Sequence, residues 1–201
     1  MPEERDRARA KRNCRLGGLI AAVQNGISKK NSKPYAMLTL EDLAGSVQVL
    51  CMNENYDKYR PLFELNKAIM VVGEVSGGDD KPKIFPQEIF PLEDAPRKYI
   101  RQVHVRASAS RLGSDALAAL QQLVTTHKGQ CPLFLCVEMP GGELVFIETH
   151  ERFRVLPSLA FQREVEALFG DGSYYAKVDT SLPERAQRRW ERREDDGNNG
   201  D

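Results

Sequence analysis

The sequence predicts an all-β barrel followed by a small α+β domain. The first observation is the run PYAMLTLEDLAGSVQVL at positions 34–50, where two alternating stretches flank an acidic turn. The second is the order of predicted elements over positions 14–94, which is three strands, a helix and two strands. The third is a second series of predicted strands and helices that begins after position 97. Together they indicate an all-β OB-fold barrel followed by a small α+β domain.

The alternation at positions 34–50 has the period of half-buried strands. The residues expected to face inward are Ala36, Leu38, Leu40, Val47 and Val49. The residues expected to face outward are Tyr35, Met37, Thr39, Ser46, Gln48 and Leu50. Between the two strands, Asp42 and Gly45 supply the turn chemistry of a hairpin.

Four further segments complete the predicted barrel. The run LGGLIAAV at 16–23 predicts the first strand, because glycines inside a strand are typical of the sharp coiling that closes a small barrel. The segment 53–63 predicts a helix that begins at Asn53 and ends near Pro61. The segments 68–75 and 83–92 predict the last two strands, separated by a loop rich in glycine and aspartate.

The second domain is predicted to follow a short linker at 91–97. In chain order, its expected elements are a strand at 99–107, a helix at 114–127, a hairpin of strands at 132–138 and 143–149, a short extended piece at 153–156, a helix at 159–169 and a strand at 174–178. Ser114 and Asp115 are expected to cap the first helix, and Gly129 to stop it.

Charged segments flank the two domains. Positions 1–13 predict a charged linker or helix, and positions 180–201 predict a charged, disordered tail with little apolar content apart from Trp190. The barrel domain is therefore expected over 14–94 and the α+β domain over 97–179.

Composition excludes several classes of protein. The 29 basic and 29 acidic residues sum to a formal charge of zero. No run approaches the roughly 20 apolar residues of a membrane helix, so we expect no membrane contact and a cytoplasmic location. The four cysteines form no CxxC pair and the three histidines are scattered, which predicts free thiols and no metal site.

The sequence also predicts no catalytic residues and no cofactor. It lacks GxxxxGK[ST], GxGxxG and a nucleophile elbow. The acidic pairs at 41–42 and 79–80 are interpreted as turn residues, because neighbouring carboxylates in a turn point apart instead of converging.

A basic loop predicts contact with nucleic acid. Lys29, Lys30 and Lys33 lie between the first two strands, and no acidic residue occurs between Asp6 and Glu41. Lysine neutralises phosphate, while an outward-facing tyrosine can stack on a base. The full predicted set is Arg15, Lys29, Lys30, Lys33, Tyr35, Met37, Thr39, Lys81 and Lys83. The alternative is a solvated polar loop, and the acidic pair at 79–80 weakens the case for Lys81 and Lys83.

An ordered series of motifs resembles one family over residues 16–178. The motifs are LGGLIAAV, KKNSKPYAMLTLEDLAGSVQVL, NYDKYRPLF, MVVGEV, PQEIFPLEDAPRKY, His127-Lys128-Gly129, Arg154-Val155-Leu156-Pro157-Ser158 and Leu168-Phe169-Gly170. In this order they resemble the C-terminal region of the bacterial DNA polymerase III alpha subunit, a C-family polymerase. The pair Cys51-Met52 departs from the more usual aromatic-containing end of the third strand.

The resemblance implies an OB domain that contacts single-stranded template DNA and a second domain that docks on the tau subunit of the clamp loader. It also implies the remainder of the alpha subunit as a partner, and no enzymatic activity for this chain alone, because the family's catalytic region lies N-terminal to these motifs. Two alternatives stay open. One is a protein-interaction fragment without DNA binding, and the other is an anticodon-binding OB domain, since the TLED-x-x-G element occurs there too.

Overall fold

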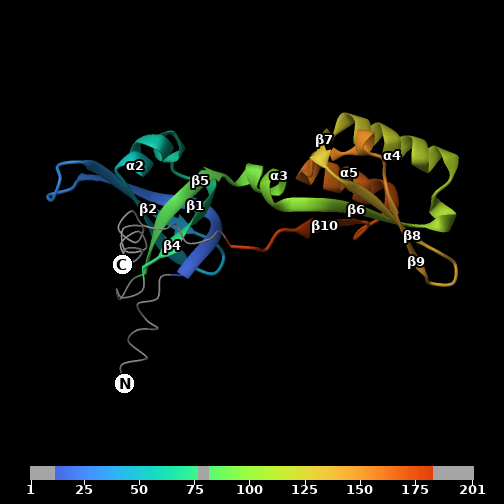
Figure 1. Cartoon of the computed structure of the whole chain (residues 1–201), viewed down its shortest axis with the longest axis horizontal. Helices are drawn as coiled ribbons and strands as arrows, with labels where there is room; N and C mark the ends of the chain where they lie inside the picture. The colour runs from blue at the N-terminus through green and yellow to red at the C-terminus, as the bar shows by residue number, and fades with distance from the viewer. Residues whose placement is uncertain (1–11, 77–81, 183–201) are drawn as a thin grey trace, which may run out of the picture. The chain divides into compact units, whose positions relative to one another are not determined.

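The computed structural model describes residues 12–76 and 82–182, which form two compact units (Figure 1). The barrel unit comprises residues 12–76 and 82–93 together with 181–182, and the second unit comprises residues 94–180. The predicted contact Lys81, the predicted N-terminal segment up to position 11 and the tail from 183 onward, with Trp190, lie outside the described residues.

The barrel unit is a closed five-stranded barrel with strand order β1-β2-β3-β5-β4. Its strands are β1 (Arg12–Ile27), β2 (Pro34–Glu41), β3 (Ser46–Met52), β4 (Ala68–Val75) and β5 (Lys83–Pro91). The β3–β5 pair is parallel and closes the barrel, whereas the other pairs are antiparallel. This arrangement confirms the predicted OB-fold.

The core of the barrel follows the predicted alternation. Ala36, Leu38, Leu40 and Val49 are at most 1% exposed, while Val47 is partly buried at the end of its strand. The other strands complete this core with Ile20, Ile69, Val71, Ile84 and Ile89. Burial of these side chains supplies the main favourable term for the barrel.

The first strand is longer than predicted. β1 covers 16 residues instead of eight. Its polar ends bury little apolar surface, but their backbones still form hydrogen-bonded pairs with β4 and β2. Its first half pairs with β4 and its second half with β2, and Leu19 pairs with both. A register shift between Ile20 and Ala22 marks the bulge at this change of partner.

The predicted helix at 53–63 is divided in two. The α-helix α2 (Glu54–Tyr59) is followed by the 3-10 turn η1 (Arg60–Leu62), which carries Pro61 in its first turn. Asn53 begins the helix through its backbone, at φ 52°, and its side chain does not cap α2. Side-chain bonds from Asn55 to the Pro86 carbonyl (2.6 Å) and from the Tyr59 hydroxyl to the Gln87 carbonyl (3.1 Å) fasten α2 to β5.

The second unit contains a four-stranded sheet in the order β10-β6-β8-β9. Its elements are α3 (Ala95–Tyr99), β6 (Ile100–Ser108), the turn η3 (Ala109–Arg111), α4 (Ser114–Thr126), β7 (Lys128–Cys131), β8 (Leu133–Glu138), β9 (Leu144–Glu148), the turn η4 (Glu151–Phe153), α5 (Leu159–Phe169) and β10 (Tyr174–Val178). β6 and β8 are parallel, and α4 and α5 share one apolar core with them around Val103, Val105, Leu133 and Phe161.

Several local predictions for this unit are wrong. The segment predicted as a linker at 91–97 contains the boundary between the two units, but it is helical instead of extended: the 3-10 turn η2 (Leu92–Asp94) is followed by α3, because a proline in the first turn is compatible with a helix. Gly113, not Ser114, is the N-cap of α4. Gly129 does not stop that helix but lies in β7, a strand the sequence did not predict.

The segment at 153–156 is extended only in part. Phe153 ends the turn η4, and Val155 alone bridges to Lys128 and Cys131 of β7. Within residues 12–76 and 82–182, no helix has the length and apolar character to cross a membrane.

We predict that Gly73→Ala destabilises the barrel by about 1–3 kcal/mol, because the added methyl would lie 2.2 Å from the Phe85 carbonyl oxygen of the neighbouring strand. Gly17→Ala is the matched control. Its methyl would meet the end of the Leu92 side chain at 2.9 Å, which can move aside, so we expect a loss below about 1 kcal/mol. Urea unfolding of both variants tests this, and equal losses would contradict it.

Candidate nucleic-acid interface

The strand register aligns the outward side chains of β1, β2 and β3 in three rows. Directly opposite residues of paired strands share a face of the sheet. The rows are Gly26–Tyr35–Met52, Gln24–Met37–Leu50 and Ala22–Thr39–Gln48. In the parallel pair, Gln48 lies opposite Lys83, which extends the third row to β5. Below, this outward surface is called the three-row face.

The three-row face therefore unites four of the predicted binding residues, Tyr35, Met37, Thr39 and Lys83, in one surface. All four are partly exposed, whereas their sequence neighbours on β2 are buried in the core. The Tyr35 ring lies over Gly26, where a side-chain methyl would be 2.6 Å from the ring. Glycine at this position thus gives the ring room to cover the end of β1.

The basic loop between β1 and β2 is shaped by its own hydrogen bonds. The Ser28 amide donates to the Lys33 carbonyl (2.9 Å), and the Ser32 amide donates to the Ser28 carbonyl (2.8 Å). The Asn31 side chain accepts from the Lys33 amide (3.3 Å) and donates to the Asn53 side chain (3.4 Å). These bonds hold the loop beside the start of α2.

The three lysines of this loop point their charge toward solvent. Lys29, Lys30 and Lys33 are exposed, and none forms an ion pair with another residue in the described ranges. Because Lys33 directly precedes β2, the charges flank the row that holds Tyr35. Lysines beside an exposed aromatic ring are the combination that single-stranded nucleic acid requires.

The structure does not bring every predicted residue to this face. Arg15 lies opposite Val72 in the half of β1 that pairs with β4, and its guanidinium donates to the Ser181 carbonyl (2.5 Å). Lys81 lies outside the described residues. Lys83, by contrast, lies in the third row, and its backbone is anchored to Ser76 by two hydrogen bonds (2.8 and 3.1 Å). The role of all these residues in binding stays a prediction.

The predicted binding set lacks several members of this surface. Gln24 and Met52 enter the rows only through strand pairing, and Leu50, predicted to face outward, was not among the predicted contacts. Asn31 lies beside the face in the loop and is tied to Asn53. For the β3 residues, the sequence did contain a signal, which is the register of the β2–β3 hairpin. A turn at 42–45 determines which β3 residue lies opposite each β2 residue.

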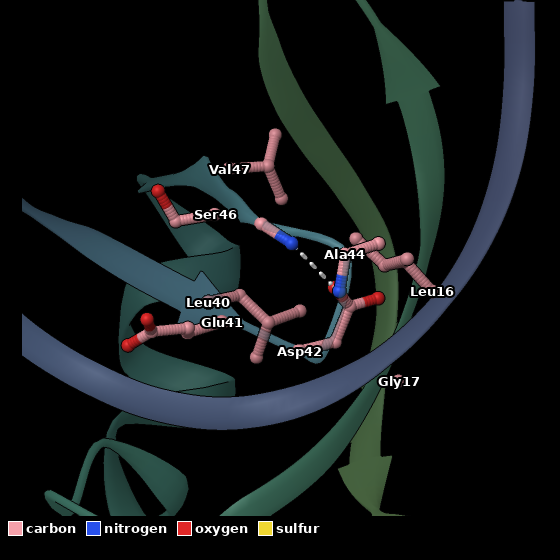
Figure 2. Close-up of a pocket in the computed structure, with 9 residues that line it drawn as sticks. Leu16, Gly17, Leu40, Glu41, Asp42, Ala44, Ser46 and Val47 are labelled. Atoms are coloured by element: carbon pink, nitrogen blue, oxygen red, sulfur yellow. Dashed lines mark hydrogen bonds between the residues drawn. The ribbon is translucent and has the colours of Figure 1, made fainter.

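A shallow pocket of about 220 Å³ lies at the other end of β2, beside the β2–β3 turn (Figure 2). Leu16 and Gly17 of β1 line one side, and the turn lines the other. The Asp42 carboxylate accepts from the amides of Ala44 (2.8 Å) and Gly45 (3.0 Å). It is therefore engaged in the turn, as the sequence predicted, and the acidic pair at 41–42 makes this pocket unsuitable for phosphate.

The four cysteines, Cys14, Cys51, Cys131 and Cys136, are free thiols. Burial raises the pKa of the Cys51 thiol to about 12, and burial also raises the pKa values of Cys14 and Cys131. In the part of the chain that the structure describes, no group of three His, Cys, Asp or Glu side chains is placed to hold a metal ion.

A comparison with protein families agrees with the closed five-stranded barrel. Residues 15–92 match a family described as an OB-fold nucleic acid binding domain, whose name refers to the tRNA anticodon. This range covers the complete barrel from β1 to β5.

The chain is similar to the DNA polymerase III alpha subunits of several bacteria. It is 25% identical over 84% of its length to that of Saccharopolyspora erythraea, 25% over 79% to that of Mycobacterium tuberculosis H37Rv, and 24% over 76% to that of Escherichia coli K12. It spans 14%, 13% and 13% of the lengths of these relatives. The similarity to alpha subunits inferred from the motifs is confirmed at this level.

Solved structures with a partial likeness include two from other organisms. One is the second single-stranded DNA binding protein of Mycobacterium smegmatis, with a TM-score of 0.35, 11% identity, and coverage of 41% of this chain and 90% of that one. The other is the second OB-fold domain of replication protein A from Methanococcus maripaludis, with a TM-score of 0.32, 22% identity, and coverage of 41% and 85%.

We predict that Cys51 resists alkylation by iodoacetamide at pH 8 in the native chain. With a pKa of about 12, only about one thiol in 10,000 is a thiolate at this pH, and the side chain is fully buried. Mass spectrometry should find Cys51 unmodified while partly exposed Cys14 reacts, and all thiols should react in denaturant. Equal native labelling of Cys14 and Cys51 would contradict the burial of β3.

Proposed function

We propose that this chain is a non-catalytic C-terminal part of a DNA polymerase III alpha subunit whose barrel holds single-stranded template DNA. The observation that carries the proposal is the three-row face, which joins Tyr35 and Met37 to Lys83 beside the lysine loop. The similarity to alpha subunits over about four fifths of the chain supports it. In this proposal the chain acts in the cytoplasm, and catalysis belongs to the rest of the alpha subunit.

The three-row face offers both kinds of contact that a single strand needs. Tyr35, Met37 and Leu50 present aromatic and apolar surface on which bases can stack. Lys29, Lys30 and Lys33 can neutralise phosphates at the edge of that surface. Stacking contributes about 1–3 kcal/mol per base and tolerates any sequence, which suits a domain that must accept every template.

We expect the triple variant Lys29→Ala, Lys30→Ala, Lys33→Ala to bind labelled oligo-dT at least tenfold more weakly than wild type. Because three phosphate contacts are lost, the slope of log affinity against log salt should become shallower by about 2. Fluorescence anisotropy at two salt concentrations measures both quantities. A matched triple variant, Arg60→Ala, Arg163→Ala, Lys177→Ala, removes the same charge from exposed positions outside the loop and should change neither.

The same titration separates the alternatives. A wild type that binds no oligo-dT at low salt would contradict DNA binding and favour a protein-interaction fragment. A marked preference for an anticodon stem-loop over oligo-dT would favour the tRNA-binding alternative, to which the name of the matched family also points.

We further propose that the second unit is a small α+β domain that docks on the tau subunit of the clamp loader through β9. In the described sheet β9 is an edge strand, paired with β8 alone. Leu144, Val145, Phe146 and Ile147 are between 42% and 61% exposed, although they alternate between the two faces. An open edge with apolar side chains on both faces suits the addition of an apolar strand from a partner.

We expect the variant Phe146→Ser, Ile147→Ser to bind purified tau subunit at least tenfold more weakly than wild type in calorimetric titration, because both faces of the edge lose apolar surface. Leu65→Ser, Leu159→Ser is the control, since both leucines are exposed on other elements. Circular dichroism must show both variants folded. An unchanged affinity in the β9 variant, or an equal loss in the control, would contradict docking at this edge.

A further inference from the structure

The second unit contains a pocket of about 540 Å³ that is lined in part by cationic side chains. It is formed by α3, the start of β6, β7 and the segment after Val155. Arg97, Arg101 and Lys128 line it, and no aspartate or glutamate is among its lining residues. The volume is in the range of pockets that hold ligands of nucleotide size.

The wall of this pocket is fixed by a close backbone approach. The Gly129 amide donates to the Arg154 carbonyl (3.1 Å), and the Leu156 amide donates to the His127 carbonyl (2.7 Å). A side-chain methyl at Gly129 would lie 2.4 Å from the Leu156 nitrogen, so only glycine fits here. The two segments therefore stay in contact and keep Lys128 in the lining of the pocket.

The three cations differ in how far their charge is compensated. Arg101 donates twice to one oxygen of the Asp179 carboxylate (3.2 and 2.6 Å), which orients its guanidinium and offsets its charge. Arg97 and Lys128 are exposed and have no ion-pair partner among residues 12–76 and 82–182. The pocket thus keeps two uncompensated positive charges, which attract an anion.

Part of the pocket lining is apolar. Its apolar residues are Ile100, Pro132, Leu156 and Pro157, and Gln130 adds a side-chain amide. A nucleotide fits both parts of the lining, since its base can lie on the apolar residues while its phosphate contacts the cations. An acidic peptide would use the cations but leave the apolar residues without a partner.

We propose that this pocket binds one nucleotide of a single strand, with Arg97 and Lys128 as phosphate contacts. The inference rests on the proposed function, because it gives single-stranded DNA a second contact on the chain besides the three-row face. It assigns a nucleic-acid role to the second unit in addition to protein docking.

The test compares two variants of equal charge in oligo-dT titrations of the full chain. Arg97→Ala, Lys128→Ala should bind about tenfold more weakly than wild type, with a salt slope shallower by about 1.4, because two phosphate contacts of a single strand are lost. Arg163→Ala, Lys177→Ala removes two exposed cations of the same unit that do not line the pocket and should match wild type. Circular dichroism of both variants monitors folding.

The outcomes separate this inference from the proposed function. If the pocket variant matches its control while the loop-lysine variant loses binding, the pocket inference is overturned and the proposed function stands. If wild type binds no oligo-dT, both fall. If dTMP competes with oligo-dT at an equal concentration of nucleotide, the pocket binds free nucleotides. If the pocket variant alone loses binding of polyglutamate, the pocket binds an acidic peptide. Either result overturns the inference.

Discussion

The division of β1 between two partner strands is the constraint on which the barrel depends. One continuous strand pairs with β4 through its first half and with β2 through its second, and the bulge between Ile20 and Ala22 turns it from one to the other. The bend brings backbones into close approach, so that a methyl at Gly18 would lie 2.6 Å from the Glu41 carbonyl oxygen. A side chain there would push these two backbones apart, so glycine favours the closure of the barrel at this point.

The candidate interface follows from this closure. The second half of β1 carries Gln24 and Gly26 beside Met37 and Tyr35, and the loop after β1 delivers the lysines to the start of β2. A slip of one residue in the β1–β2 pairing would turn these outward side chains into the core. The same buried residues that stabilise the barrel therefore also determine which side chains a nucleic acid can reach.

Alternation and turn chemistry allowed prediction of what depends on neighbours in sequence. The inward set from Ala36 to Val49, the role of Asp42 in the turn and the helix at 159–169 were predicted because each rests on local periodicity. The errors share the opposite cause. Gly129 resembles a helix stop, yet its place is decided by Val155 and Leu156, which approach it only in the folded unit. The position of Arg15 also depends on contacts distant in sequence: strand pairing places it opposite Val72 of β4, and its role in binding stays a prediction.

The neutral total charge of the chain is compatible with DNA binding because opposite charges are separated along β2. Lys33 precedes this strand, Glu41 ends it eight residues later, and Asp42 follows in the turn. At about 3.3 Å per residue the two ends are about 26 Å apart, which exceeds the screening length of about 8 Å at physiological salt. A phosphate beside the loop therefore experiences the lysines and very little of the acidic turn. In the proposed complex, a strand on this face would be attracted at the Tyr35 end and repelled at the Glu41 end.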